Sequence, residues 1–323
     1  MGRLAFRPET LPLTALYGLA LIPPVAAGLA IFGEPAAIDL GIALAVGGVF
    51  DGLGRLLRRP PPLSPVVTAV LAVALIGPAA APWWAAVVAA AAGLFEVVRG
   101  TLPKPALPLS SGLLAYAVVY LSGHGALGAY LAPGRSSRPF PEPIRLWHDF
   151  FGGAAAPLDP VTLYVGNVAG PLFATSLLAV SIGALWLWYA QRLDLAALAG
   201  IAAGGLAATL SQGWNPAYQL LSGPLLFAAV FGFADRKVLA GPPLVGGVIG
   251  AAAAFTGVWL RTRGAGIETA VVALAAAQIG TAAVVGLVRF LRSGAPRRAL
   301  SRLRRSRPAL AVPRIGRAAV LRR

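Results

Sequence analysis

Long apolar runs are the feature that most constrains how this chain can fold. Runs close to the roughly 20 residues that cross a hydrocarbon core recur from residue 11 to residue 292. Hydrophobic residues make up 58% of the 323 positions and charged residues only 12%. A soluble domain carries about a quarter charged residues, so this chain has too little charge to cover a water-facing surface. The sequence therefore predicts an all-α integral membrane protein.

Breaker residues between the apolar runs mark the ends of ten predicted spans. We place them near residues 11–32, 37–54, 64–80, 82–99, 108–131, 168–190, 194–212, 216–234, 241–261 and 266–292, which makes residues 1–293 one transmembrane domain. The longest connection, residues 132–167, is rich in proline and glycine. Because long connections tend to carry function, we expect it to fold in part against the membrane surface.

The distribution of basic residues predicts the orientation. Lysine and arginine gather at alternate connections, which places both termini in the cytoplasm and residues 132–167 outside. Arg261 and Arg263 are exceptions to this bias, as are the arginines of the long connection. Residues 294–323 hold ten arginines and no acid, so we expect a disordered cytoplasmic tail that lies on anionic lipid headgroups. The tail lacks interleaved aromatic residues, so nucleic acid is not an expected partner.

Two segments share a pattern that suggests an internal duplication. Each starts at a hydroxyl residue, Thr68 or Ser222, passes a tight turn and continues into a span of small residues. Such a likeness indicates two five-span halves around a site near the membrane midplane. In sequence this rich in alanine and glycine, it also arises by chance.

Ionisable residues inside a membrane are costly, so each is a candidate functional residue. Three acids lie near span ends with a basic residue close by in sequence, and interfacial ion pairs account for them: Asp51 with Arg55, Glu96 with Arg99, and Asp235 with Arg236. Asp39 and Asp194 are interpreted as helix-start acids.

Glu268 begins the last predicted span, and Gln278 follows ten residues later. That separation is about 15 Å along a helix. Two interpretations stand: the two side chains line one cavity, or Glu268 caps the start of its own helix.

The sequence gives little support to catalysis by this chain alone. It has no cysteine, which excludes disulfides and cysteine-held iron–sulfur clusters. His124 and His148 have no carboxylate at ligand spacing, so neither a metal site nor haem is expected. No phosphate-binding loop, nucleophile motif or paired-aspartate magnesium motif is present, and we assign no catalytic residue.

Three stretches carry a recognisable pattern: residues 68–84 (TAVLAVALIGPAAAPWW), 166–183 (GNVAGPLFATSLLAVSIG) and 221–235 (LSGPLLFAAVFGFAD). Their order and spacing resemble the RnfD/NqrB family, whose members belong to the Rnf electron-transport complex and to the sodium-pumping NADH:quinone reductase. Glu268 and Gln278 fall where that family has Pro-Glu-Gly and, ten residues later, Asn. The likeness covers about residues 12–292.

The resemblance implies a membrane subunit of a redox-driven, ion-translocating electron-transport complex in the cytoplasmic (inner) membrane of a bacterium. Other subunits would bring the electrons, and this chain would carry them or act as a non-catalytic scaffold. The implied cofactor is a noncovalent flavin, FMN or riboflavin, with candidate binding residues Gly153, Thr175, Ser176 and Ser222. The implied ion pathway uses Asp235, Glu268 and Gln278.

The departures from the family concern the flavin. In the family a threonine in an outward Ser/Thr-Gly-Ala-Thr-Pro-Leu motif carries covalent FMN, but the matching position here is Ala155 or Ala156. Without a hydroxyl no phosphoester forms, so we predict no covalent flavin. The family's Gly-Glu-Thr-Ser motif has also lost its acid, at Ala174.

Two other functions remain open from the sequence. A secondary transporter or permease of the same fold needs no cofactor and is compatible with few intramembrane charges. An assembly or anchoring protein would work mainly through the arginine-rich tail.

Overall fold

A computed structural model describes residues 11–58, 61–102, 108–123, 125–134, 138–151, 158–236 and 242–292. Within these ranges every regular element is a helix, and β pairing is limited to two isolated bridges. The prediction of an all-α protein is confirmed. The chain divides into two compact units, residues 1–282 and 283–323, and the described part of the second is the end of the last helix.

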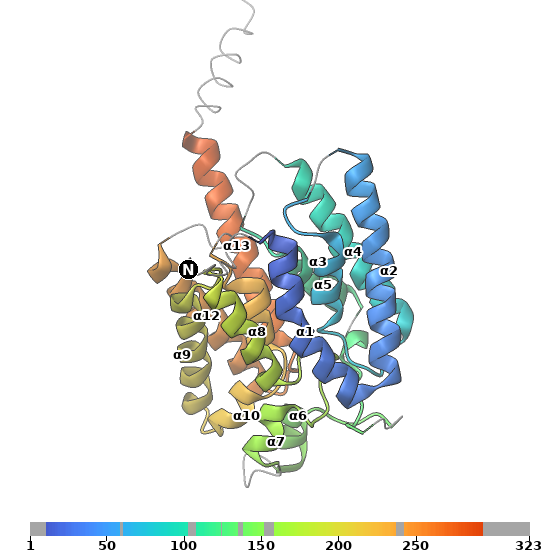
Figure 1. Cartoon of the computed structure of the whole chain (residues 1–323). Helices are drawn as coiled ribbons and strands as arrows, with labels where there is room; N and C mark the ends of the chain where they lie inside the picture. The colour runs from blue at the N-terminus through green and yellow to red at the C-terminus, as the bar shows by residue number, and fades with distance from the viewer. Residues whose placement is uncertain are drawn as a thin grey trace, which may run out of the picture. The chain divides into compact units, whose positions relative to one another are not determined.

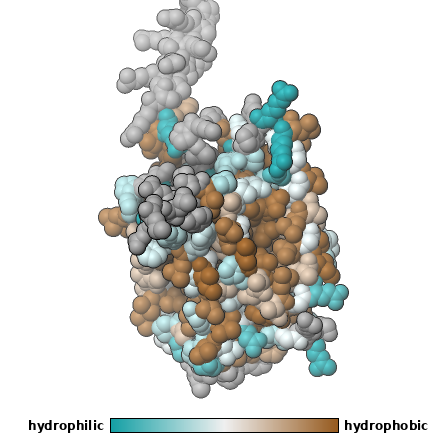
Figure 2. All heavy atoms as spheres, in the orientation of Figure 1, coloured by the Kyte–Doolittle hydropathy of each residue, from teal (hydrophilic) through white to brown (hydrophobic). Residues whose placement is uncertain are grey.

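In the described part of the chain, five helices are long and apolar enough to cross a membrane. They are α1 (Leu13–Phe32), α2 (Glu34–Leu56), α4 (Pro82–Thr101), α12 (Pro243–Thr262) and α13 (Thr269–Arg292), and each coincides with a predicted span. On the face shown in Figure 2, hydrophobic side chains cover the middle of the bundle and hydrophilic ones gather toward its ends. This distribution matches an apolar core between polar boundaries.

The other five predicted spans hold shorter or interrupted helices. They are α3 (Pro65–Val73), α5 (Ser111–Ser122), α8 (Leu177–Tyr189), α9 (Leu195–Ser211), and the pair α10 (Pro216–Leu221) and α11 (Leu225–Ala228), which runs into a π-helical turn at Ala229–Phe233. Glycine and proline follow α3 at Gly77-Pro78 and precede α11 at Gly223-Pro224, and proline removes a helical hydrogen-bond donor. The hydropathy pattern located these segments but not the breaks within them.

Backbone groups freed by the break after α3 find partners in other non-helical segments. The amides of Leu172 and Phe173 donate to the carbonyls of Ile76 and Ala74 at 2.8 and 3.1 Å. The Gly77 amide donates to the Leu127 carbonyl at 2.8 Å. An unsatisfied backbone group in hydrocarbon costs several kcal/mol, so irregular backbone is tolerated only where protein surrounds it.

Helix pairing is equivalent in the two halves of the chain. In the first half α2 packs on α4, and in the second half α9 packs on α12. The second contact depends on glycine, because a Cβ at Gly200 would lie 2.0 Å from the Gly247 carbonyl oxygen, and one at Gly204 would lie 2.1 Å from that of Ala251. Small residues permit this close approach. This one pair joins the second and fourth predicted spans of each half, and the internal duplication stays a prediction.

The long connection folds at one end of the bundle. It contains α6 (Pro143–Leu146), a π-helical turn (Trp147–Phe151) and α7 (Pro160–Val165). In Figure 1 these elements lie together with α10 at the lower end of the view, which we name the loop end. Trp147 packs edge-on against Tyr218 of α10 with ring centroids 4.3 Å apart, which fixes the connection to the bundle.

Candidate functional site

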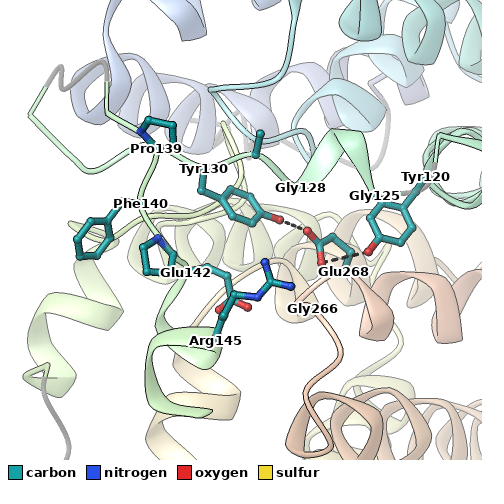
Figure 3. A pocket seen from close by; sticks show the side chains of 12 residues that line it. Tyr120, Gly125, Gly128, Tyr130, Pro139, Phe140, Glu142, Arg145, Gly266 and Glu268 are labelled. Atoms are coloured by element: carbon teal, nitrogen blue, oxygen red, sulfur yellow. Dashed lines mark hydrogen bonds between the residues drawn. The ribbon is translucent and has the colours of Figure 1, made fainter. Parts of the chain in front are cut away.

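A cavity lies between the long connection and the neighbouring ends of the spans. It has a volume of about 620 Å³ and is lined by the end of α5, residues 125–130, residues 139–145 and the loop before α13. Polar and aromatic side chains dominate its wall (Figure 3): Tyr120, Tyr130, Phe140, Glu142, Arg145 and Glu268. Among the sequence-predicted site residues that are described, Glu268 lines this cavity.

Glu268 is held by two phenols that reach it from opposite sides (Figure 3). Tyr130 donates a hydrogen bond to its Oε1, and Tyr120 donates to its Oε2 at 3.5 Å. A phenol keeps its proton at neutral pH, so both tyrosines act as donors to the carboxylate. No described hydrogen bond joins the Glu268 carboxylate to the start of α13. Glu268 therefore lines a cavity, but Gln278, which was expected to line the same cavity, is not among the residues of its wall.

Two glycines make room for the Glu268 carboxylate. A Cβ at Gly128 would lie 2.2 Å from Oε1, and a Cβ at Gly266 would lie 2.2 Å from Oε2. Both contacts involve the end of a flexible side chain. A larger residue at either position would therefore displace the carboxylate rather than the backbone.

Glu142 is a second acid in the cavity wall, and sequence reasoning missed it. It precedes Pro143 and caps α6, where its Oε2 accepts a hydrogen bond from the Ile144 amide at 2.6 Å. Its side chain is buried and its Oε1 has no hydrogen-bond partner. Burial, and then the charge of Glu268, raise the pKa of Glu142 to about 7.

Arg261 lies fully buried beneath the same region, at the end of α12. Its guanidinium donates to the carbonyl of Ile267, through Nε at 3.0 Å and through Nη2, and to the carbonyl of Gln219 at 3.5 Å. These bonds fix the loop that carries Glu268. The charge of Arg261 also acts on Glu142, lowering the pKa of that carboxyl.

The other two predicted ion-pathway residues lie elsewhere. Asp235 forms a buried ion pair with Arg192, whose Nη2 is 2.6 and 2.8 Å from its two carboxylate oxygens. The expected partner was Arg236, the neighbour in sequence. Gln278 joins two segments instead: its Nε2 donates to the Gly232 carbonyl at 2.7 Å, and its Oε1 accepts from the Ser110 amide at 3.1 Å.

Of the other acids considered in the sequence, three have the interaction that was predicted for them and one does not. Asp51 with Arg55 at 2.7 Å and Glu96 with Arg99 at 3.5 Å are the ion pairs that were predicted. Asp194 caps α9, as expected of a helix-start acid. Asp39 does not start a helix, because α2 begins at Glu34 and Asp39 is buried within it with Oδ1 unpartnered.

The three described candidates for flavin binding engage nearby backbone. Thr175 donates to the Pro171 carbonyl, and Ser222 donates to the Tyr218 carbonyl. Ser176 caps α8 by accepting from the Ala179 amide at 3.3 Å. None of these hydroxyls lines the cavity described above. Gly153 and the alanines at 155 and 156 lie outside the described residues, as does His124.

An aromatic cluster includes side chains close in sequence to the undescribed residues 152–157. Trp147 stacks on Trp214 with centroids 5.8 Å apart, and Tyr218 donates from its hydroxyl to the Leu158 carbonyl at 3.0 Å. No motif in the sequence singles out these tryptophans. Among the described residues there is no group of three or more His, Cys, Asp or Glu side chains that could hold a metal ion.

Long apolar helices, interrupted spans and a polar cavity at one end define a multi-pass α-helical membrane protein. Residues 12–277 match the family model of the NQR2, RnfD, RnfE family, which is most of the chain. The chain belongs to this family, so it is a membrane subunit of the Rnf and Nqr type. A search of the curated proteins finds no match.

Proposed function

We propose that this chain is the membrane subunit of a redox-driven, ion-translocating electron-transport complex whose partner subunits supply the electrons. The family match over residues 12–277 carries this proposal. The interrupted spans support it, because ion and substrate sites in membrane proteins form where helices break. The basic bias of alternate connections supports an orientation in a bacterial cytoplasmic membrane with both termini inside and the loop end outside.

A noncovalent flavin, FMN or riboflavin, suits the cavity in size and chemistry. Its volume of about 620 Å³ falls within the range of small-molecule sites. Tyr120, Tyr130 and Phe140 offer aromatic faces to a planar ring, and Arg145 offers a charge that complements the phosphate of FMN. When bound, the flavin would supply one- and two-electron transfer, while the protein residues bind and orient it.

An absorbance spectrum of protein purified in mild detergent tests the flavin. We expect a flavin spectrum that stays with the folded protein and moves to the low-mass fraction after denaturation. Phe140→Ala should reduce the flavin retained, whereas Val161→Ala, an exposed residue of α7 outside the cavity wall, should not. Protein that carries no flavin and recovers no partner subunits would contradict the proposal.

A secondary transporter is a second candidate function. The breaks in the spans that contain α3 and α11 favour it, because transporters place their sites at discontinuous helices. Uptake of a substrate into proteoliposomes that contain this chain alone would support transport. Strict dependence of activity on partner subunits would support the electron-transport complex.

Anionic lipid is a further proposed partner, through the arginine-rich tail at 294–323. Each basic residue near an anionic surface contributes about 1 kcal/mol of attraction. Truncation after Arg292 should therefore weaken binding of the purified protein to anionic vesicles. Full activity of the truncated protein would also exclude an anchoring function that resides in the tail.

A further inference from the structure

One carboxyl oxygen of Glu142 receives no hydrogen bond from any described protein group. Its side chain is 3% exposed, and its Oε1 is buried against the cavity wall without a hydrogen-bond partner. Its other oxygen is already used by the Ile144 amide. A buried carboxylate oxygen without a partner is strongly unfavourable, so Oε1 requires a proton, a cation or a ligand donor.

The charged groups around Glu142 do not neutralise it directly. Arg261, on α12, directs its guanidinium at the backbone carbonyls of Ile267 and Gln219. Arg145, on α6, is exposed at the cavity mouth, and the described residues show no salt bridge from it to Glu142. Glu268, before α13, adds a negative charge close by. Tyr120 of α5 and Tyr130 of the 129–131 segment both face Glu268.

The two acids therefore have different environments. Glu268 receives hydrogen bonds from two phenols, one on each of its carboxylate oxygens. Glu142 is held by backbone amides, those of Ile144 and Arg145. It lines the cavity, and its Oε1 is buried without a hydrogen-bond partner among the described residues. Of the two acids, Glu142 therefore has the oxygen that is free to take up a proton.

We propose that Glu142 is a proton-exchange site at the loop end, which binds a proton on Oε1 from the water of the cavity. In the exchange the O–H bond of the Glu142 carboxyl breaks and the proton passes to a cavity water molecule, which becomes hydronium. The bonding electron pair stays on the carboxylate, so nothing is oxidised or reduced. The existence of the site does not depend on the proposed electron transport; only its use as an entry or exit for translocated protons rests on that function.

Infrared spectroscopy of the full-length protein in detergent tests the site. Over a titration from about pH 5 to about pH 9, the wild type should show a protonated-carboxyl band that disappears with a midpoint near pH 7. Glu142→Gln should remove the part of this band that belongs to one carboxyl, and Asp39→Asn, at another buried acid with an unpartnered oxygen, should leave that part in place. Glu34→Gln, at an exposed acid in the first turn of α2, should leave both the band and its midpoint unchanged.

A second variant keeps the proposal testable if Glu142→Gln fails to give folded protein. Glu268→Gln removes the neighbouring negative charge, so the midpoint should fall by about one unit. A band of undiminished amplitude in Glu142→Gln, or a midpoint that does not move in Glu268→Gln, would overturn the proposal. A midpoint that differs between sodium chloride and choline chloride at equal ionic strength would also overturn it, since the ligand would then be a metal cation. Loss of flavin with an intact titration would count against the proposed function alone.

Discussion

Arg192 and Asp235 form a buried ion pair between segments 43 residues apart, with the Arg192 Nη2 2.6 and 2.8 Å from the two Asp235 oxygens. Tyr17 of α1 adds a hydrogen bond to the same carboxylate at 2.6 Å. A backbone hydrogen bond joins the same two segments, because the Asp194 amide donates to the Ala234 carbonyl at 2.8 Å. Asp235, first interpreted as a residue of an ion pathway, therefore joins three elements of the bundle.

Neutralising Asp235 should destabilise the protein strongly. Asp235→Asn leaves the buried Arg192 without its counter-charge, and loss of one partner of a buried pair costs about 3–5 kcal/mol. Asp51→Asn breaks a pair whose arginine side chain is 82% exposed, so it should cost at most about 1 kcal/mol. Unfolding in mixed detergent micelles measures both. If Arg192→Ala combined with Asp235→Asn costs as much as the two single changes added together, the residues are not coupled.

The stability of the protein should fall as the pH rises through neutrality because of Glu142. Its pKa is about 7 in the folded protein and about 4.5 as a free side chain, so the folded state binds the proton more tightly. The stabilisation is complete below about pH 4.5 and is lost as the pH passes 7, by an upper limit of about 3 kcal/mol.

Glu142→Gln should flatten this dependence, because an amide does not titrate in the range. The measurement is the free energy of unfolding at several pH values, with Glu34→Gln as the control that keeps the wild-type slope. Wild-type stability that rises between pH 5 and pH 8 would show that other groups dominate or that Glu142 is ionised throughout.

The sequence predicted the long helices well, because burial in a bilayer depends on composition summed over a whole span. The breaks at Gly77-Pro78 and Gly223-Pro224 were visible as residues but were averaged away by the apolar residues around them. Whether such a break ends a helix depends on partners elsewhere, here the amides of Leu172 and Phe173. Those partners are set by tertiary packing, which one sequence does not contain.

For the same reason, the sequence identified one of the two acids in the cavity wall and missed the other. Glu268 stood out because an acid at the start of an apolar span is costly. Glu142 lies among prolines in a connection and belongs to no motif, so only the cavity reveals it. Local spacing also misled: it offered Arg236 as the partner of Asp235, whereas the fold brings Arg192 from another segment.

The contact between α9 and α12 should tolerate no added side chain. A Cβ at Gly204 would lie 2.1 Å from the Ala251 carbonyl oxygen, and backbone on both helices would have to separate. Gly204→Ala should therefore cost about 1–3 kcal/mol despite the better helix propensity of alanine. Gly48→Ala on α2 meets nothing within 4 Å and should be neutral or slightly stabilising. Equal stability of the two variants would show that α9 and α12 are further apart.

We predict that this chain carries no covalent flavin, because its resemblance to the family implies alanine at the acceptor position. After denaturation and electrophoresis, the wild-type band should show no flavin fluorescence even when the protein is produced together with a flavin transferase. Ala155→Thr and Ala156→Thr each restore a hydroxyl under one of the two alignments with the family motif, so a fluorescent band in one variant would identify the acceptor position. The other variant then serves as the matched control, since it has the same composition and a misplaced hydroxyl. A fluorescent wild-type band would mean that another hydroxyl residue accepts the flavin phosphate.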